Sequence, residues 1–137
     1  LGDQLTNASI EQRLAVVEIR RGRHSTAREL SEGSLSVAED LGDQDTVGLS
    51  LRTLGDLALA IGRPGDAAAY LERALGVWQR LGRPLEQARI LARLERAMTA
   101  AGDPDSAGGY RSRWRTRLAE LGLDEPALRL PPFHGVH

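Results

Sequence analysis

The sequence predicts an all-α fold: an α-α superhelix, or solenoid, of three helical-hairpin repeats, with six helices and a possible short C-terminal helix. A Leu-Gly pair recurs every 40 residues, at positions 1–2, 41–42, 81–82 and 121–122. A second glycine series has the same period, at Gly22, Gly62 and Gly102. The apolar residues follow helical spacing, and the sequence lacks the alternation of a strand.

The glycines divide each 40-residue unit into two helices, because glycine readily adopts the left-handed backbone that ends a helix. We expect helices at 4–21, 25–41, 45–61, 64–81, 84–101 and 104–121, with a possible short helix near 124–129. The repeats are then about 4–42, 43–82 and 83–122. A single helix pair cannot bury its apolar stripe, whereas three stacked pairs share one core.

The first repeat is more polar along its stripe than the second. Glu11 and Glu18 stand where the second repeat has Leu51 and Ala58. Terminal repeats are often atypical in this way. Alternatively, further repeats precede Leu1 in a longer protein, and the first repeat then exposes an apolar face through which two copies could pair.

The second repeat has one apolar stripe in each helix. Its first helix carries Val47, Leu51, Leu54, Ala58 and Ile61, and its second carries Ala67, Leu71, Ala74, Trp78 and Leu81. Pro64 and Pro104 begin helices, where the missing N–H has no partner to lose. We interpret Trp78 and Trp114 as core residues.

The C-terminal sequence LPPFHGVH, at 130–137, contains two prolines and few residues to bury. We expect it to be a loose end, so we place one domain at 1–123 and a tail at 124–137. His134 and His137 could chelate a metal ion. We favour a mobile histidine pair and assign no metal site.

The second repeat resembles a tetratricopeptide repeat. Its large, small, small, large and small residues match that family's pattern at Leu54, Gly55, Ala67, Leu71 and Ala74. Standard repeats have about 34 residues. The 40-residue form is similar to C-terminal arrays of actinobacterial transcriptional regulators, and the resemblance covers about 4–121. HEAT and armadillo repeats have a similar length but lack this small-residue pattern.

The outer repeats depart from this pattern. In the third repeat, Glu95 replaces a small residue, Arg111 a large apolar residue and Trp114 a small one. In the first repeat, Ser31 and Ser34 weaken it. The resemblance is therefore clearest in the second repeat.

The resemblance implies a concave groove that is lined by the first helix of each pair and binds a peptide. The family's groove positions correspond here to Gln12, Val16, Arg52, Asp56, Leu59, Arg89, Arg93 and Arg96. Chaperone-binding members clamp a terminal carboxylate with five positions. Arg89 and Arg93 match two of them, whereas the other three depart from the pattern, as Gln12, Val16 and Thr53.

Two interpretations of Arg89 and Arg93 remain open. They are four residues apart, so they share a helix face and could bind an acidic peptide. They could instead pair with Glu86 or remain on a solvated rim.

Composition excludes several classes of function. The formal net charge is −1, which gives no basic footprint for nucleic acid. No apolar run approaches the ~18 residues of a membrane span, and the absence of cysteine fits the reducing cytoplasm. The 18 basic residues are all arginine, which fits a GC-rich genome. We find no catalytic constellation, so we expect neither an enzyme nor a cofactor.

The sequence therefore predicts a non-catalytic protein–protein interaction module, the repeat domain of a larger bacterial transcriptional or signalling regulator. Its partner would be a protein, a peptide or another domain of the same full-length chain. Two alternatives remain open: a sensor domain for a small signalling peptide or molecule, and a self-association domain that forms a homodimer.

Overall fold

The structure is a computed structural model that describes residues 2–131 of the 137-residue chain. In this range it consists of helices without strands: α1 (Gly2–Arg20), α2 (His24–Leu41), α3 (Gln44–Ala60), α4 (Pro64–Leu81), α5 (Pro84–Ala100), α6 (Pro104–Leu121) and the short 3-10 helix η1 (Glu125–Leu128). The all-α prediction is confirmed, and the expected helix bounds agree to within two residues. None of the described helices is long and apolar enough to cross a membrane.

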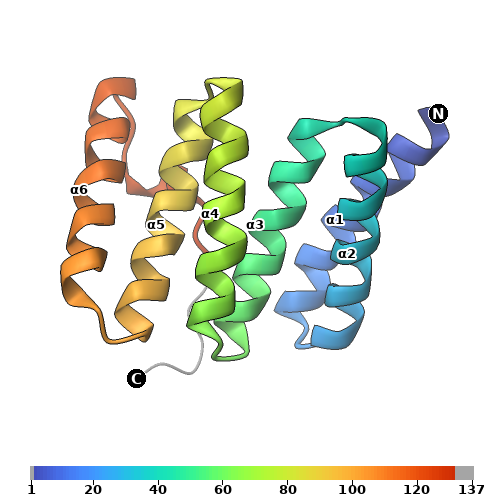
Figure 1. Cartoon of the computed structure of the whole chain (residues 1–137), viewed down its shortest axis with the longest axis horizontal. Coiled ribbons are helices and arrows are strands. Elements are labelled where there is room, and N and C mark those ends of the chain that lie inside the picture. The colour runs from blue at the N-terminus through green and yellow to red at the C-terminus, as the bar shows by residue number, and fades with distance from the viewer. Residues whose placement is uncertain (1, 132–137) are drawn as a thin grey trace.

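The helices form antiparallel pairs that stand side by side in a row (Figure 1). α3 packs against α1 and α5 as well as against its sequence neighbours. The even-numbered helices have no comparable contacts with one another. The odd-numbered helices are therefore closer together and form the inner face of the superhelix, while the even-numbered helices form its outer face.

Glycines end the helices at intervals of 20 residues. Six of them have φ between +65° and +78°, namely Gly22, Gly42, Gly62, Gly82, Gly102 and Gly122. This left-handed backbone reverses the chain and lets the following N–H groups reach the last carbonyls of the helix. The predicted role of both glycine series is confirmed.

Two glycines let α3 and α4 pack closely against each other in the core. Trp78 is 2% exposed, and a Cβ placed on Gly48 would lie 2.5 Å from its indole ring. A Cβ on Gly55 would lie 2.7 Å from Leu71. The two helices can approach this closely because these glycines have no side chain. The interpretation of Trp78 and Trp114 as buried packing residues is confirmed.

Polar side chains join α1 to its neighbours. Ser34 Oγ donates a hydrogen bond to the carbonyl oxygen of Ala8 (2.7 Å) and lies 3.0 Å from Ser50 Oγ. Gln12 Nε2 donates to Thr53 Oγ1 (2.9 Å). These hydrogen bonds are buried. Around α1 they take the place of part of the apolar packing that, in the second repeat, holds α3 against α4.

The other side of α1 exposes apolar residues. Ile10, Leu14 and Val17 are 49%, 47% and 40% exposed, and their spacing places them in one stripe. Glu18 is buried instead, and Arg21 and Arg23 donate to its carboxylate, each at 3.4 Å. The first repeat therefore exposes an apolar face beside its polar contacts.

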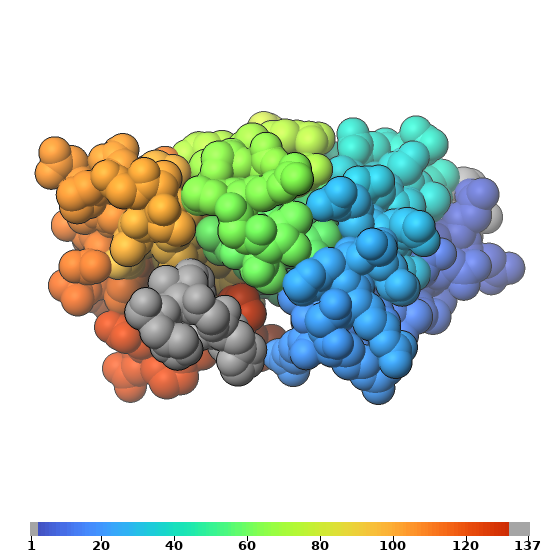
Figure 2. Space-filling model, turned by 90° about the horizontal axis from the view of Figure 1, so that it is seen from below, coloured from blue at the N-terminus to red at the C-terminus, as the bar shows by residue number. Residues whose placement is uncertain are grey.

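The chain after α6 returns along the inner face of α5 (Figure 1). Leu128 is 2% exposed and belongs to the core, and Ala127 and Leu130 pack against that core. Figure 2 shows the red residues of this segment on the same side of the molecule as the orange helix α6. The expected loose end is wrong for Leu130 and Pro131, because side chains and carbonyls there find partners on α5. The rest of that end, 132–137, lies outside the described residues.

Candidate functional site

All eight predicted groove residues lie on the inner helices. α1 carries Gln12 and Val16, α3 carries Arg52, Asp56 and Leu59, and α5 carries Arg89, Arg93 and Arg96. Asp56 and Arg93 bond to each other directly, whereas Gln12 and Arg52 bond to Thr53 and Glu86 on the neighbouring inner helices.

Arg93 is at the centre of the polar surface on α5. Its side chain is 3% exposed, and its Nε donates to Asp56 Oδ1 (2.8 Å) on α3. Its Nη1 donates to the carbonyl oxygens of Arg89 (3.0 Å) and Leu128 (3.2 Å), and its Nη2 donates to that of Arg129 (2.8 Å). The guanidinium group thus binds one carboxylate and three main-chain carbonyls.

The neighbouring arginines continue this contact along the same segment. Arg89 Nε donates to the carbonyl oxygen of Ala127 (2.9 Å), and Arg96 Nη1 donates to that of Pro131 (2.8 Å). The three arginines of α5 therefore hold the C-terminal segment by its main chain, as a groove would hold a peptide ligand.

Carboxylates balance the charges of these arginines. Glu86 Oε1 lies 2.6 Å from Arg89 Nη1, and Glu86 Oε2 lies 3.3 Å from Arg52 Nη1. Arg89 pairs with Glu86 as one interpretation of the arginine pair predicted, whereas Arg93 pairs with Asp56. The alternative of a solvated rim is wrong, because both arginines are buried. Burial and then the nearby Arg93 charge lower the pKa of Arg52, and the same two causes lower the pKa of Arg96. The arginines are crowded and partly desolvated, which strengthens their hydrogen bonds to acceptors.

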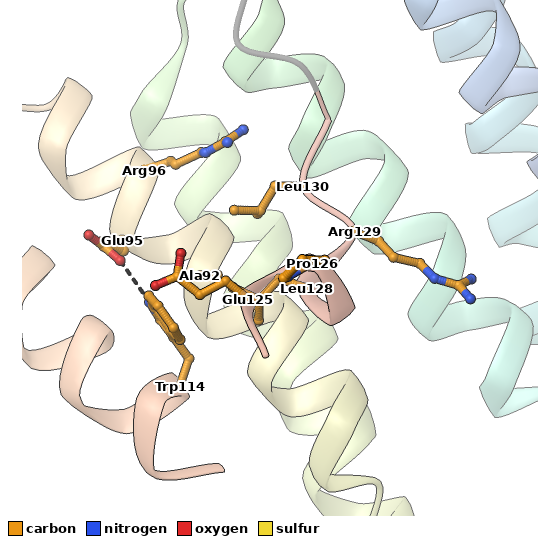
Figure 3. A pocket seen from close by; sticks show the side chains of 9 residues that line it. All are labelled: Ala92, Glu95, Arg96, Trp114, Glu125, Pro126, Leu128, Arg129 and Leu130. Carbon is orange, nitrogen blue, oxygen red and sulfur yellow. Dashed lines mark hydrogen bonds between the residues drawn. The ribbon is translucent and has the colours of Figure 1, made fainter. Parts of the chain in front are cut away.

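A cavity of about 510 Å³ lies between α5, α6 and the C-terminal segment (Figure 3). Its nine lining residues are Ala92, Glu95, Arg96, Trp114, Glu125, Pro126, Leu128, Arg129 and Leu130. Five of the nine belong to the C-terminal segment. The cavity therefore depends on the docked position of that segment.

Of the three residues that depart from the repeat pattern, two donate hydrogen bonds to the third. Trp114 Nε1 donates to Glu95 Oε1 (2.7 Å; Figure 3), and Arg111 Nε donates to Glu95 Oε2 (2.7 Å). Glu95 occupies a position where the repeat usually has a small residue. It accepts hydrogen bonds from Arg111 and Trp114, which themselves replace a large apolar and a small residue. The three departures are visible in the sequence, but their contact is not. Their joint occurrence in one repeat was the available signal.

The described residues offer no metal centre. Between residues 2 and 131, no group of three or more His, Cys, Asp or Glu side chains could hold a metal ion. His134 and His137 lie outside the described residues.

Comparison with known proteins identifies the repeat. A family model described as tetratricopeptide repeat matches residues 6–80, which is more than half of the chain. The chain belongs to the tetratricopeptide repeat family. A search of curated proteins found no sequence that matches the chain.

Solved structures share this tetratricopeptide repeat fold. The TPR domain of Arabidopsis FLU is 18% identical with a TM-score of 0.78, and the match covers 85% of this chain and 98% of that one. BtubC (BKLC) from P. vanneervenii is 21% identical with a TM-score of 0.79. That match covers 95% of this chain and 52% of BtubC, so this chain spans about half of the BtubC length.

The tetratricopeptide repeat pattern is not equally strong along the chain. The family model covers α1 to α4 and stops before α5 and α6. The unmatched pair is the one in which Glu95, Arg111 and Trp114 replace the usual residues. The structural matches nevertheless extend over 85% and 95% of the chain, so the third pair keeps the fold without the sequence pattern.

Proposed function

We propose that this chain is a non-catalytic module that binds a peptide or a partner domain in its concave groove. Tetratricopeptide repeat domains generally mediate protein–protein interactions. The observation that carries the proposal is the α5 half of the groove, where three arginines hold the C-terminal segment by its carbonyls. A surface with this chemistry can hold a segment of another chain in the same way.

The proposed contact residues divide into two halves of the groove. Arg89, Arg93 and Arg96 form the half that meets the C-terminal segment. The other half lies on α1 and α3 and consists of Gln12, Val16, Arg52, Asp56 and Leu59. The half-buried Val16 and Leu59 supply apolar contact area among these polar groups. A partner in this half would meet both apolar and hydrogen-bonding side chains.

We further propose that the module belongs to a larger bacterial transcriptional or signalling regulator in the cytoplasm. The 40-residue period supports this context, since α2, α4 and α6 begin at residues 24, 64 and 104. The use of arginine for all 18 basic residues and the absence of cysteine support it as well. The partner would then be a protein or another domain of the same full-length chain, with no direct contact to nucleic acid.

Peptide selection tests the binding function. Peptides selected from a displayed library on the full chain should bind wild type and lose at least about tenfold in affinity with Arg52→Ala or Arg93→Ala. Arg73→Ala is the matched control, because Arg73 lies on α4 with a side chain 54% exposed. Calorimetry measures each affinity. Equal affinities in all four chains would contradict binding in the groove.

Self-association is a second candidate function, and the exposed stripe of Ile10, Leu14 and Val17 favours it. Apolar patches of this kind often form contacts between copies. Sedimentation analysis should then find a homodimer that Leu14→Lys converts to monomer. A wild-type chain that remains monomeric at millimolar concentration would reject this candidate.

A further inference from the structure

We propose that the α5 half of the groove is a site for a leucine-bearing peptide that is recognised through its main-chain carbonyls, and that residues 124–131 occupy this site in cis until such a partner displaces them. This inference rests on the proposed function, because it assigns a partner class and a competitor to the same groove. Partner binding then requires release of the chain's own segment.

The arginines of α5 recognise main chain in this site. Four carbonyl oxygens between residues 127 and 131 accept their hydrogen bonds, over distances of 2.8–3.2 Å. Every residue has a carbonyl, so these bonds select an exposed stretch of main chain, whatever its side chains. The Arg129 side chain is exposed and points away from the cavity in Figure 3. The site therefore does not recognise the side chain at this position.

The charges around the site favour a neutral partner over an acidic one. Asp56 lies 2.8 Å from Arg93, and Glu86 lies 2.6 Å from Arg89. Four arginines outnumber these two carboxylates, but an acidic peptide would compete with the carboxylates for donors of Arg52, Arg89 and Arg93 that they already bind. Main-chain carbonyls accept the remaining hydrogen bonds of the arginine N–H groups without adding charge. The structure thus favours a neutral peptide over the acidic peptide that the arginine pair alone suggests.

Apolar contacts give the site its side-chain preference. Leu128 is 2% exposed within the core, and Ala127 and Leu130 pack against that core. Ala127 and Leu128 lie in the one turn of 3-10 helix that begins at Glu125, and Leu130 follows it. A fitting partner therefore presents the pattern Ala-Leu-x-Leu, with a short helical turn before the second leucine.

The docked segment has a conformation that its own sequence does not favour. Arg129 has φ +51°, and no other non-glycine residue between residues 2 and 131 has a positive φ. This left-handed backbone is unfavourable for residues with a Cβ. A short tether from α6 raises the local concentration of the segment to the order of millimolar, which offsets that cost. A partner with glycine at this position would avoid the cost and could displace the segment.

Substitutions of Arg129 test the inference without touching the helices. Arg129→Val should loosen the docked segment, because a β-branched residue tolerates positive φ least. Arg129→Gly should hold it more firmly, and both variants remove the same exposed charge. The probe is a labelled, end-capped peptide of residues 123–131, measured by fluorescence anisotropy on the full chain. We expect Arg129→Val to bind it about tenfold more tightly than Arg129→Gly.

Two controls define the site of binding. A peptide with serine in place of both leucines should not bind Arg129→Val, and adding Arg93→Ala to that variant should abolish binding of the original peptide. Amide hydrogen exchange at residues 127 and 129 should be faster in Arg129→Val than in Arg129→Gly. Equal peptide affinity in both variants, or binding that survives Arg93→Ala, would overturn the inference. A dimer that the peptide dissociates would also overturn it, because the occupant would then come from a second copy.

The outcome can be separated from that of the proposed function. If library-selected peptides depend on Arg52 yet bind wild type, Arg129→Val and Arg129→Gly equally, the binding function stands and this inference fails. If only the peptide of residues 123–131 binds, and it prefers Arg129→Val, the segment's site stands and the wider binding function fails.

Discussion

The first and last inner helices, α1 and α5, end the array in different ways. α5 is covered on its inner face by the chain's own residues 124–131, with Leu128 buried at 2% exposure. α1 leaves Ile10, Leu14 and Val17 between 40% and 49% exposed. One end is therefore closed by the chain's own segment, and the other end offers an uncovered apolar stripe. Helices with the same place in the repeat thus differ in what covers them.

The interior contacts of the two ends differ as well. α1 is joined to α2 and α3 through Ser34, Gln12 and Thr53. A buried hydrogen bond of this kind contributes about 1 kcal/mol net, whereas a buried leucine contributes about 1.5–3 kcal/mol. We therefore expect α1 to open locally before α5 does.

The largest expected effect lies in the central pair that connects the two ends. Trp78→Ala should lower the free energy of unfolding by about 3–5 kcal/mol, because it removes a large buried side chain that fills the space beside Gly48. Trp78→Phe should cost less, since the indole N–H has no hydrogen-bond partner among the described residues. Chemical denaturation measures both. A loss below about 1 kcal/mol for Trp78→Ala would contradict its burial.

Arg93→Ala tests the closed end of the array. We expect a loss of about 2–4 kcal/mol in unfolding free energy, because Asp56 and the carbonyls of the C-terminal segment lose their donor together. Arg73→Ala removes an exposed pair with Glu39 at 3.9 Å and should cost less than about 0.5 kcal/mol. Equal losses in the two variants, measured by urea denaturation, would show that the segment is not held at Arg93.

Ser34→Ala tests the polar packing at the α1 end. It leaves the carbonyl of Ala8 and the hydroxyl of Ser50 without this partner, so we expect a loss of about 1–2 kcal/mol. Amides in α1 should exchange faster while those in α5 remain unchanged. A uniform acceleration along the whole chain would mean that the two ends open as one unit.

Leu14→Lys should have the smallest effect on stability. Leu14 is 47% exposed, so the unfolding free energy should stay within about 0.5 kcal/mol of wild type. A larger loss would show that the stripe on α1 is covered within the chain.

Much of the fold follows from the period of the sequence. Both glycine series and the apolar stripes depend on local backbone geometry, which repeats every 20 residues, so helix number and helix bounds can be predicted. The inner-face positions follow from the same register. Contacts between residues of different helices could not be predicted from this period. The close approach of Gly48 to Trp78 and the bonding of Glu95 with Trp114 depend on how two helices meet.

The docked C-terminal segment was beyond prediction for a different physical reason. The donors of Arg93 bind carbonyls, which every residue has, so the sequence of the segment carries no polar signature of the contact. The two prolines at residues 131 and 132 indicate a loose end when read alone. Only the apolar residues Leu128 and Leu130 hint at burial, and two leucines are a weak signal.

Residue-resolved hydrogen exchange on the wild-type chain tests the contrast between the two ends most directly. If α5 is closed by its own segment, the amides of Ala127 and Arg129, which donate to Asp124 and Pro126, should be protected, and α5 should exchange more slowly than α1. If those two amides exchange as fast as in the isolated peptide of residues 123–131, the segment is not docked and both ends of the array are open.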